Sequence, residues 1–326
     1  MLLGKSFIDE LNRYGTNREP FLFIIDFEEI YPLVYPLSAV PKTLRFTLPG
    51  YPDPINSNVV GSVFRLNSQP VSYLGYLTAF EQVLHHLRQG DSYLVNLTFP
   101  TPIKTDLSLE EIYELSEAPY KLLMENQFVV FSPEPFIRIN GGMISSYPMK
   151  GTIDASLPEA EKRVLEDRKE SAEHTTIVDL IRNDLSKVAD CVQVKRYRYI
   201  DHIRTLDKEI LQVSSEIRGL LPDGFFRHLG NILDALLPAG SISGAPKKRT
   251  LEIIREAESG PRGYYTGIFG VFDGQNLDSA VMIRFIEQTE SGMQYRSGGG
   301  ITHLSDPVAE YQEMVQKVYL QITKNK

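Results

Sequence analysis

The order of strand-like and helix-like segments is the feature that most restricts the fold of this chain. Three strand-like segments follow one another at 264–272, 277–286 and 294–298. Asp273-Gly274 and Ser291-Gly292 stand between them, and such dipeptides are typical of the tight turns that join antiparallel strands. Parallel strands would instead need a crossover helix between successive strands. The sequence therefore predicts an α+β fold with antiparallel sheets.

Periodicity and turn residues predict the remaining elements. Helices are expected at 77–87, 107–115, 158–188, 225–237, 246–256 and from Asp306 to about Lys324. Further strands are expected at 93–99 and 210–217, with a meander at 128–131, 136–139 and 143–146. Residues 20–75 are rich in Pro and in β-branched or aromatic side chains, which is typical of short strands and loops.

Composition excludes several classes of protein. The chain has 326 residues and a formal net charge of −8, without a Lys/Arg run, so a nucleic-acid partner is not expected. The longest apolar runs, such as 21–25, are too short to cross a membrane, and the start of the chain has no signal-peptide pattern. Cys191 is the single cysteine, which rules out an intrachain disulfide, and we expect it to serve in packing. These features predict a soluble, cytoplasmic protein.

Lys150 is the first candidate for chemistry. It stands between Pro148, which restricts φ, and Gly151, which permits unusual backbone conformations. A lysine presented in this way can act as a nucleophile if its surroundings lower its pKa. An ordinary surface lysine in a glycine turn is the alternative.

Two pairs of carboxylates are candidates for a metal site. Glu170 and Glu173 are three residues apart on a predicted helix, as are Glu310 and Glu313, so each pair shares one helix face. Four carboxylates from two helices suit Mg²⁺, which prefers oxygen ligands. Each pair alone is equally compatible with a solvated helix face. Zinc is not expected, because the six His are scattered and there is one Cys.

Arg284 and a glycine run are candidates for binding an anion. Arg284 lies in the apolar segment 281–286, and a buried arginine needs an anionic partner. An outward-facing strand position is the alternative. The glycines at 298–300 allow backbone N–H groups to approach an anion closely, although a glycine run alone is usually a turn.

Longer segments occur in the order and approximate spacing of the chorismate-utilising enzymes, over about residues 75–325. They are Ser132-Pro133-Glu134, Pro148-Met149-Lys150-Gly151-Thr152, Glu173-His174, Ile177-Val178-Asp179-Leu180-Ile181-Arg182-Asn183-Asp184-Leu185, Gly240-Ser241-Ile242-Ser243-Gly244-Ala245-Pro246-Lys247, Arg262-Gly263-Tyr264-Tyr265, and Asp306-Pro307 through Glu313. The chain resembles most closely the aminodeoxychorismate synthase component I branch. The resemblance implies antiparallel sheets in a sandwich-like core with flanking helices. It also implies one chorismate-binding domain over 1–326, with a reduced N-terminal part at 1–75 and a catalytic core at 76–326.

The resemblance also implies roles for individual residues. Lys150 matches the lysine that attacks ring C2 of chorismate, and Glu134 matches the general acid that protonates the departing 4-hydroxyl. Ammonia then adds at C4 and displaces the lysine. The matching positions for metal and substrate are Glu170, Glu173, Glu310 and Glu313 for Mg²⁺, with Glu173 and Glu313 as the first choices for direct ligands, and Arg284, Tyr265, Gly298, Gly300, Thr152 and Ser243 for chorismate.

The sequence departs from the pattern of this branch at several positions. Leu94 replaces a usual Gln, Gln212 replaces a usual His, and the N-terminal part that holds an amino-acid inhibitor in anthranilate synthases looks reduced. Feedback inhibition by tryptophan is therefore not expected. The chain has no Gly-flanked Cys nucleophile of a glutaminase, so the resemblance implies a separate glutamine amidotransferase subunit as the source of ammonia.

Two other functions stay open. Anthranilate synthase component I is the first, although that branch usually carries a small residue where this chain has Lys150. A chorismate-binding protein without turnover is the second, with Leu94 and Gln212 as possible signs of decay. The retained Glu134, Lys150, Arg284 and metal-region glutamates argue against decay.

Overall fold

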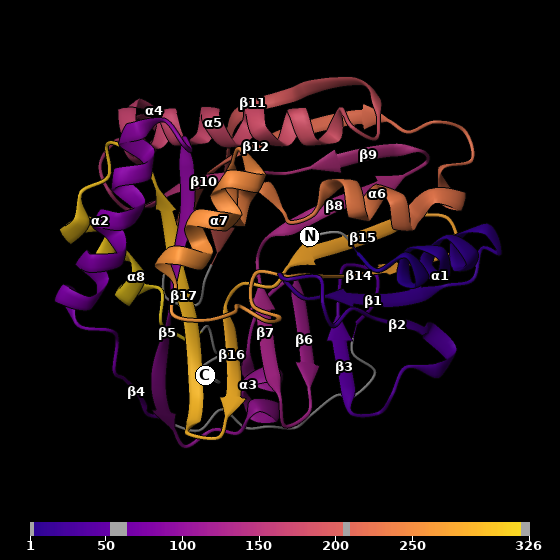
Figure 1. Cartoon of the computed structure of the whole chain (residues 1–326), viewed down its shortest axis with the longest axis horizontal. Helices are drawn as coiled ribbons and strands as arrows, with labels where there is room; N and C mark the ends of the chain where they lie inside the picture. Colours follow the sequence, from indigo (N-terminus) through magenta and orange to yellow (C-terminus); the bar gives the residue numbers. More distant parts are fainter. Residues whose placement is uncertain (1–2, 53–63, 205–208, 321–326) are drawn as a thin grey trace.

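The computed structural model describes residues 3–52, 64–204 and 209–320, and within these ranges the strands form two antiparallel sheets (Figure 1). Sheet A comprises β1 (Phe21–Ile25), β2 (Leu33–Pro36), β8 (Pro135–Asn140), β9 (Met143–Ser146), β10 (Met149–Asp154), β11 (Asp190–Arg204), β12 (Glu209–Leu220), β14 (Ile268–Phe272) and β15 (Leu277–Val281). Sheet B comprises β3 (Leu44–Thr47), β4 (Leu66–Ser68), β5 (Leu94–Thr105), β6 (Tyr120–Met124), β7 (Phe128–Ser132), β13 (Gly244–Ala245), β16 (Phe285–Thr289) and β17 (Gly292–Ile301).

Helices lie around the outside of the two sheets (Figure 1). They are α1 (Lys5–Thr16), α2 (Tyr73–Gln89), α3 (Leu109–Leu115), α4 (Ala160–Glu166), α5 (Arg168–Leu185), α6 (Leu229–Leu236), α7 (Lys247–Ala257) and α8 (Pro307–Gln316), with 3₁₀ turns η1 (Leu37–Ala39), η2 (Phe225–His228) and η3 (Gly240–Ile242). The order in sheet A is β10-β12-β9-β8-β15-β14-β1-β2, with β11 also paired to β12. The order in sheet B is β13-β5-β17-β16-β7-β6-β3, with β4 also paired to β5.

A shared apolar cluster packs the two sheets against each other. It joins Ile24 and Phe269 of sheet A to Leu122 and Val130 of sheet B, and all four are fully buried. A second cluster covers the other face of sheet A with side chains of α1, α5 and α6. Burial of apolar surface on both faces is the main force that holds such layers together. The predicted α+β fold with antiparallel sheets in a sandwich-like core is confirmed.

Local signals placed several element ends correctly. Helix α2 ends at Gly90, whose φ of 80° is the left-handed cap that glycine adopts easily. Helix α3 begins with a capping box between Ser108 and Glu111, and the Asp306 side chain caps α8 through the N–H of Ala309. The predicted hairpins β14–β15 and β16–β17 are both present.

The prediction of one strand over 277–286 was wrong. Strand β15 of sheet A ends at Val281 and β16 of sheet B begins at Phe285, so the chain crosses between sheets here. Arg284 therefore lies in a link with a φ of 54°, and not inside an apolar strand. The predicted meander fails for the same reason, because β7 belongs to sheet B and β8 to sheet A. Hydrophobic periodicity indicates which residues are buried. Because the strands before and after each passage between the sheets are both buried, periodicity does not show where one strand ends and the next begins.

Other expectations were wrong in detail. The helical region 158–188 is two helices that divide at Asp167, whose side chain caps α5 through the N–H of Glu170. Helix α8 ends at Gln316, so the described residues 317–320 are not helical, and residues 321–326 lie outside the described ranges. Cys191 is exposed on β11, so it does not serve in packing. Helix α1 and the length of β11 were not predicted.

In the described part of the chain, no helix is both long and apolar enough to span a bilayer. The division at residue 75 and the cytoplasmic location stay predictions.

Candidate functional site

Lys150 stands on an irregularity of β10, the strand at one end of sheet A. Met149 pairs with Ser214 and Thr152 with Gln212, so Lys150 and Gly151 together oppose the single residue Val213 of β12. Gly151 has a φ of 84°, which a side chain would disfavour. Such a β-bulge redirects the side chain that it carries. The expected unusual backbone at Lys150 is therefore present.

Helix α5 packs against this bulge and brings carboxylates to the lysine. Lys150 Nζ lies 2.7 Å from Glu173 Oε2, and the Glu173 side chain is only 2 % exposed. Glu170 lies beside them, since a Cβ on Gly151 would be 3.4 Å from Glu170 Oε2. Burial lowers the pKa of Lys150, but Glu173 and Glu170 outweigh it and hold the pKa above its ordinary value. The amine is charged in this arrangement and has to lose a proton before it can attack.

Helix α8 supplies the second pair of carboxylates and faces β17. Ser305 Oγ donates a hydrogen bond of 2.8 Å to the buried Glu310. A Cβ on Gly299 would lie 3.7 Å from Glu310 Oε2 and 4.0 Å from Glu313 Oε1, so both carboxylates approach the bare backbone of β17. Glu313 also contributes to the raised pKa of Lys150, so the charge of this α8 carboxylate acts on the amine of β10.

Lys317 is a second amine of this site that sequence reasoning missed. Its Nζ lies 2.7 Å from Glu313 Oε1 and donates to the Gly298 carbonyl at 2.9 Å. Burial lowers the pKa of Lys317, although Glu313 opposes this shift. Its spacing of four residues from Glu313 on the helix expected from Asp306 to about Lys324 was the available signal for this pair.

Glu134 lies in the link where the chain passes from β7 to β8. Its Oε1 accepts a hydrogen bond of 2.6 Å from Ser241 Oγ. Burial raises the pKa of Glu134, while Ser241, Arg284 and Lys317 act in the opposite direction. A carboxyl whose pKa is raised by burial is suited to donate a proton near neutral pH.

Arg284 lies in the second link between the sheets, next to the first. Phe131 N–H donates to the Arg284 carbonyl and Val281 N–H to the Glu134 carbonyl, both at 3.1 Å. The Arg284 guanidinium lies 5.1 Å from the ring centre of Tyr319. Burial lowers the pKa of Arg284, but Tyr295, Tyr319 and Tyr265 keep it raised. Among the described residues no ion pair joins Arg284 to a carboxylate, so its guanidinium is a candidate to bind an anion.

Tyr265 is packed in the core, and the glycines of β17 lie close to the neighbouring strand β5. Tyr265 is buried against Phe285, with ring centres 5.8 Å apart, and burial raises its pKa to about 12. A Cβ on Gly298 would lie 2.2 Å from the Leu97 carbonyl oxygen, so the close approach of β5 already requires glycine. A Cβ on Gly300 would lie 3.0 Å from Leu94 Cδ1, which places Leu94 directly over this part of β17.

Thr152 and Ser243 are less closely connected with the other predicted residues. Thr152 is exposed on β10, two residues beyond Lys150. Ser243 is fully buried and its hydroxyl donates to the Ala239 carbonyl at 2.9 Å. Within the described ranges, neither hydroxyl has a hydrogen bond to Lys150, Glu134 or Arg284.

The four glutamates are the type of ligand that Mg²⁺ prefers, but they are not arranged around a common point in this structure. In the described residues no group of three His, Cys, Asp or Glu side chains is close enough together to hold a metal. Glu173 and Glu313 contact lysines instead. Because Mg²⁺ often takes one or two carboxylates and completes its shell with water and substrate oxygens, the donor set still fits this ion.

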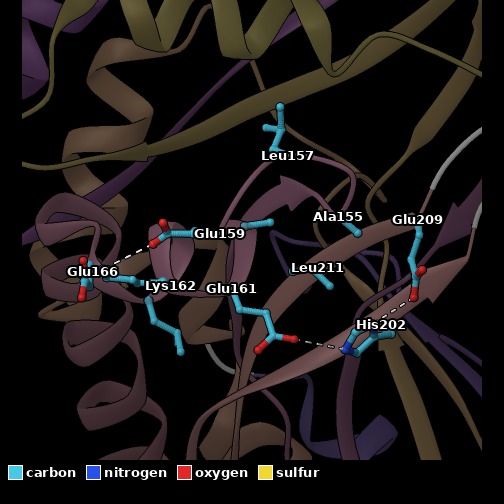
Figure 2. Close-up of a pocket in the computed structure, with 11 residues that line it drawn as sticks. Ala155, Leu157, Glu159, Glu161, Lys162, Glu166, His202, Glu209 and Leu211 are labelled. Atoms are coloured by element: carbon cyan, nitrogen blue, oxygen red, sulfur yellow. Dashed lines mark hydrogen bonds and ion pairs between the residues drawn. The ribbon is translucent and has the colours of Figure 1, made fainter.

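A cavity of about 820 Å³ lies elsewhere, beside α4 and the ends of β10 and β12 (Figure 2). His202 lies there between Glu209, at 2.9 Å, and Glu161, at 3.9 Å, and all three side chains are largely exposed. Solvated ion pairs of this kind contribute little binding energy. None of the predicted site residues lines this cavity, so we do not assign the chemistry to it.

Comparison with known proteins identifies the family. The sequence profile of the chorismate binding enzymes matches residues 53–323, which include every predicted site residue. The chain belongs to the chorismate binding enzyme family. Among curated relatives, a protein of Pasteurella multocida named "Uncharacterized PabA-like protein" is 51% identical over 97% of this chain and 98% of its own length.

More distant members of the chorismate binding enzyme family have named activities. Anthranilate synthase component 1 of Haloarcula marismortui is 36% identical over 73% of this chain and 50% of its own length. Aminodeoxychorismate synthase component 1 of Bacillus subtilis is 31% identical over 77% of this chain and 55% of its own length. The solved menaquinone-specific isochorismate synthase of Escherichia coli superposes with a TM-score of 0.69 at 16% identity, over 96% of this chain and 80% of its own. This last likeness supports the fold alone.

Proposed function

We propose that this chain is an aminodeoxychorismate synthase component I, which converts chorismate and ammonia into 4-amino-4-deoxychorismate. The observation that carries the proposal is Lys150, which a β-bulge presents among the carboxylates of α5 and α8. Anthranilate formation does not require a lysine nucleophile, whereas amination at C4 through a covalent intermediate does. The 31% identical relative with this name is consistent with the proposal.

Each residue then has a defined part in the reaction. The neutral amine of Lys150 attacks ring C2 while Glu134 protonates the departing 4-hydroxyl, which leaves as water. Ammonia adds at C4 and Lys150 leaves with its electron pair. Arg284 and Tyr265 hold the enolpyruvyl carboxylate, and Thr152, Ser243, Gly298 and Gly300 are assigned to further substrate contacts.

The proposal includes Mg²⁺ at the four glutamates. Glu173 and Glu313 would hold it directly, with Glu170 and Glu310 beside them. When bound, the ion would neutralise the ring carboxylate of chorismate. The chain's own lysines, Lys150 and Lys317, supply positive charge to the same region.

Ammonia is proposed to come from a separate glutamine amidotransferase subunit. The single cysteine of the sequence, Cys191, is exposed on β11 and is not among the residues of the candidate site. A glutaminase needs an activated cysteine, so this chain would depend on a partner or on free ammonia.

The identity of the product tests the proposal. The pure chain is mixed with chorismate, Mg²⁺ and ammonium at mildly alkaline pH, and the product is identified by mass spectrometry. Aminodeoxychorismate is the expected product. Anthranilate would support anthranilate synthase component I, which the 36% identical relative favours as a second candidate. Chorismate binding without any product, both with ammonium and with an amidotransferase plus glutamine, would indicate a non-catalytic protein.

Replacing Arg284 with Gln is expected to weaken substrate binding. In the described part of the chain no ion pair joins Arg284 to a carboxylate, so in this proposal its replacement removes a charged hydrogen bond to the substrate. Loss of such a partner costs about 2–5 kcal/mol, so KM for chorismate should rise at least about 30-fold. Steady-state kinetics measure this, with Arg284→Lys as a variant that keeps the charge. A Gln variant with the wild-type KM would exclude Arg284 from substrate binding.

Replacing Glu313 with Gln is expected to weaken the dependence on Mg²⁺. Loss of one carboxylate ligand should raise the half-saturating Mg²⁺ concentration on the order of tenfold or more. Isothermal titration of Mg²⁺ in the presence of chorismate provides a readout separate from turnover. Glu159→Gln is the matched control, because Glu159 is exposed and lines the separate cavity beside α4, which none of the predicted site residues lines. An unchanged response of the Glu313 variant would break the ligand assignment.

A further inference from the structure

Ser241 contacts the proposed acid from a segment that the fold holds firmly. Its Oγ donates to Glu134 Oε1 at 2.6 Å, and it belongs to the 3₁₀ turn η3. The backbone of the next residue, Ile242, is fixed in place, because its carbonyl accepts a hydrogen bond of 2.8 Å from the buried Arg262 guanidinium. A Cβ on Gly240, on the other side, would lie 3.0 Å from Leu180 Cδ2, so this residue packs closely against α5. Ser241 therefore has little freedom to turn away from Glu134.

The direction of this hydrogen bond distinguishes the two oxygens of Glu134. A protonated carboxyl carries its hydrogen on one oxygen and accepts hydrogen bonds mainly at the other. Because Ser241 donates to Oε1, this oxygen serves as the acceptor. Oε2 is then the oxygen that is left to carry the proton.

We propose that Ser241 is a positioning residue for Glu134: its hydroxyl fixes Oε1 as acceptor, so that Oε2 presents the proton to the leaving hydroxyl of the substrate. This inference rests on the proposed function, since it needs Glu134 to act as the acid. Without the hydroxyl, the carboxyl can rotate and present its proton in unproductive directions. Small misplacement of a catalytic group can cost about 100-fold in rate.

In the proposed reaction Glu134 Oε2 first donates a proton and later accepts one. The proton on Oε2 leaves with the 4-hydroxyl as water, and Glu134 becomes a carboxylate. When the C4–N bond forms and Lys150 departs as a neutral amine, the new ammonium group at C4 returns one proton to Oε2. Glu134 ends protonated as it began, and chorismate plus ammonia has become aminodeoxychorismate plus water.

Charged groups on several sides of Glu134 act together with Ser241. Arg284 from the β15–β16 link and Lys317 from the end of α8 favour the carboxylate form. Asp184 of α5 lines the same small cavity of about 20 Å³ as Glu134 and Ser241, and it is paired with Lys247 at 2.8 Å and Lys187 at 2.7 Å. The charges of these lysines balance the charge of Asp184. The hydrogen bond to the Glu134 carboxyl in this cavity comes from the Ser241 hydroxyl.

The test compares Ser241→Ala and Ser241→Thr with the wild type in the aminodeoxychorismate assay. In the Ala variant kcat should fall on the order of 10- to 100-fold, with KM for chorismate nearly unchanged. A donor to the carboxylate lowers the pKa of Glu134, so removing it raises this pKa. The acid then stays protonated to higher pH, and the alkaline limb of the kcat profile should move upward. The Thr variant keeps the hydroxyl and should recover most of the rate.

Two controls separate this inference from a structural effect and from the proposed function. Ser186→Ala removes an exposed hydroxyl that donates to the Arg182 carbonyl at the end of α5, and the kcat and pH profile of this variant should match those of the wild type. A Ser241→Ala variant with wild-type kcat and pH profile would overturn the inference, as would a Thr variant as slow as the Ala variant. If the wild type forms no aminodeoxychorismate, either with ammonium or with an amidotransferase plus glutamine, the proposed function fails. Infrared titration of the Glu134 carboxyl, assigned with Glu134→Gln, then decides whether Ser241 controls it.

Discussion

Replacing Lys150 with alanine is expected to abolish formation of aminodeoxychorismate, with a loss of at least about 1,000-fold in kcat. The expected loss is large because the amine forms the covalent bond on which the reaction depends, and removing a nucleophile eliminates that route. The product is measured by mass spectrometry after a fixed time. In parallel, intact-mass analysis of the wild type should reveal a chorismate-derived adduct that the variant lacks.

The control for Lys150 has to address folding. Its removal leaves the carboxylate of Glu173, which is 2 % exposed, without the amine 2.7 Å away. Lys150→Gln is therefore compared with Lys150→Ala, because the amide still donates a hydrogen bond but is not a nucleophile. Both variants should retain the wild-type circular dichroism and both should be inactive. Turnover within tenfold of the wild type in either variant would remove Lys150 from the mechanism.

Replacing Arg262 with methionine is expected to lower the free energy of unfolding by about 3–5 kcal/mol. The guanidinium is 1 % exposed and forms a fork with Glu258, at 2.6 Å and 3.0 Å. It also donates to the carbonyls of Ile242 in η3 and Asn96 in β5. Methionine fills part of the volume but leaves the Glu258 carboxylate buried without its partner. Urea unfolding curves measure the change in free energy of unfolding.

A double variant tests the physical reason for that loss. Arg262→Met together with Glu258→Leu removes both charges, and it should be more stable than Arg262→Met alone, because no buried charge is left uncompensated. Glu258 also accepts from the backbone and hydroxyl of Thr98, so recovery should be incomplete. A single Arg262 variant within about 1 kcal/mol of the wild type would show that the buried fork is not required for stability.

The sequence predicted the class of fold and most individual elements because those depend on local signals. Gly90, Ser108 and Asp306 mark helix ends through their own backbone or side-chain chemistry. Antiparallel pairing followed from short turns between neighbouring strands. These signals act over a few residues and do not require knowledge of the tertiary structure.

The passage between the two sheets was not predictable in the same way. Residues 277–286 read as one apolar strand, because both β15 and β16 are buried and no proline or glycine marks the break. Arg284 has a φ of 54° without being glycine, and that conformation is fixed by the tertiary structure. The sequence thus indicated Arg284 as an anion-binding candidate but placed it in the wrong kind of element.

In the candidate site, too, residues in sequence motifs were found from the sequence, whereas residues that matter through tertiary contacts were not. Lys150 and Glu173 were selected from the motifs, and the structure brings their side chains within 2.7 Å of each other, while their roles stay predictions. Lys317 and Ser241 were not selected, because their importance depends on contacts with Glu313 and Glu134 from distant parts of the chain. Spacing along one helix suggests a shared face, but it does not show what lies opposite that face.

The two links between the sheets have a consequence for how this family can change its chemistry. Glu134 and Arg284 are held by main-chain bonds of the links, through their carbonyl groups, in addition to the contacts of their side chains. These main-chain bonds do not depend on which side chain stands at position 134 or 284. New preferences for a substrate or a leaving group can thus arise at positions 134 and 284 by single substitutions, without rebuilding either sheet.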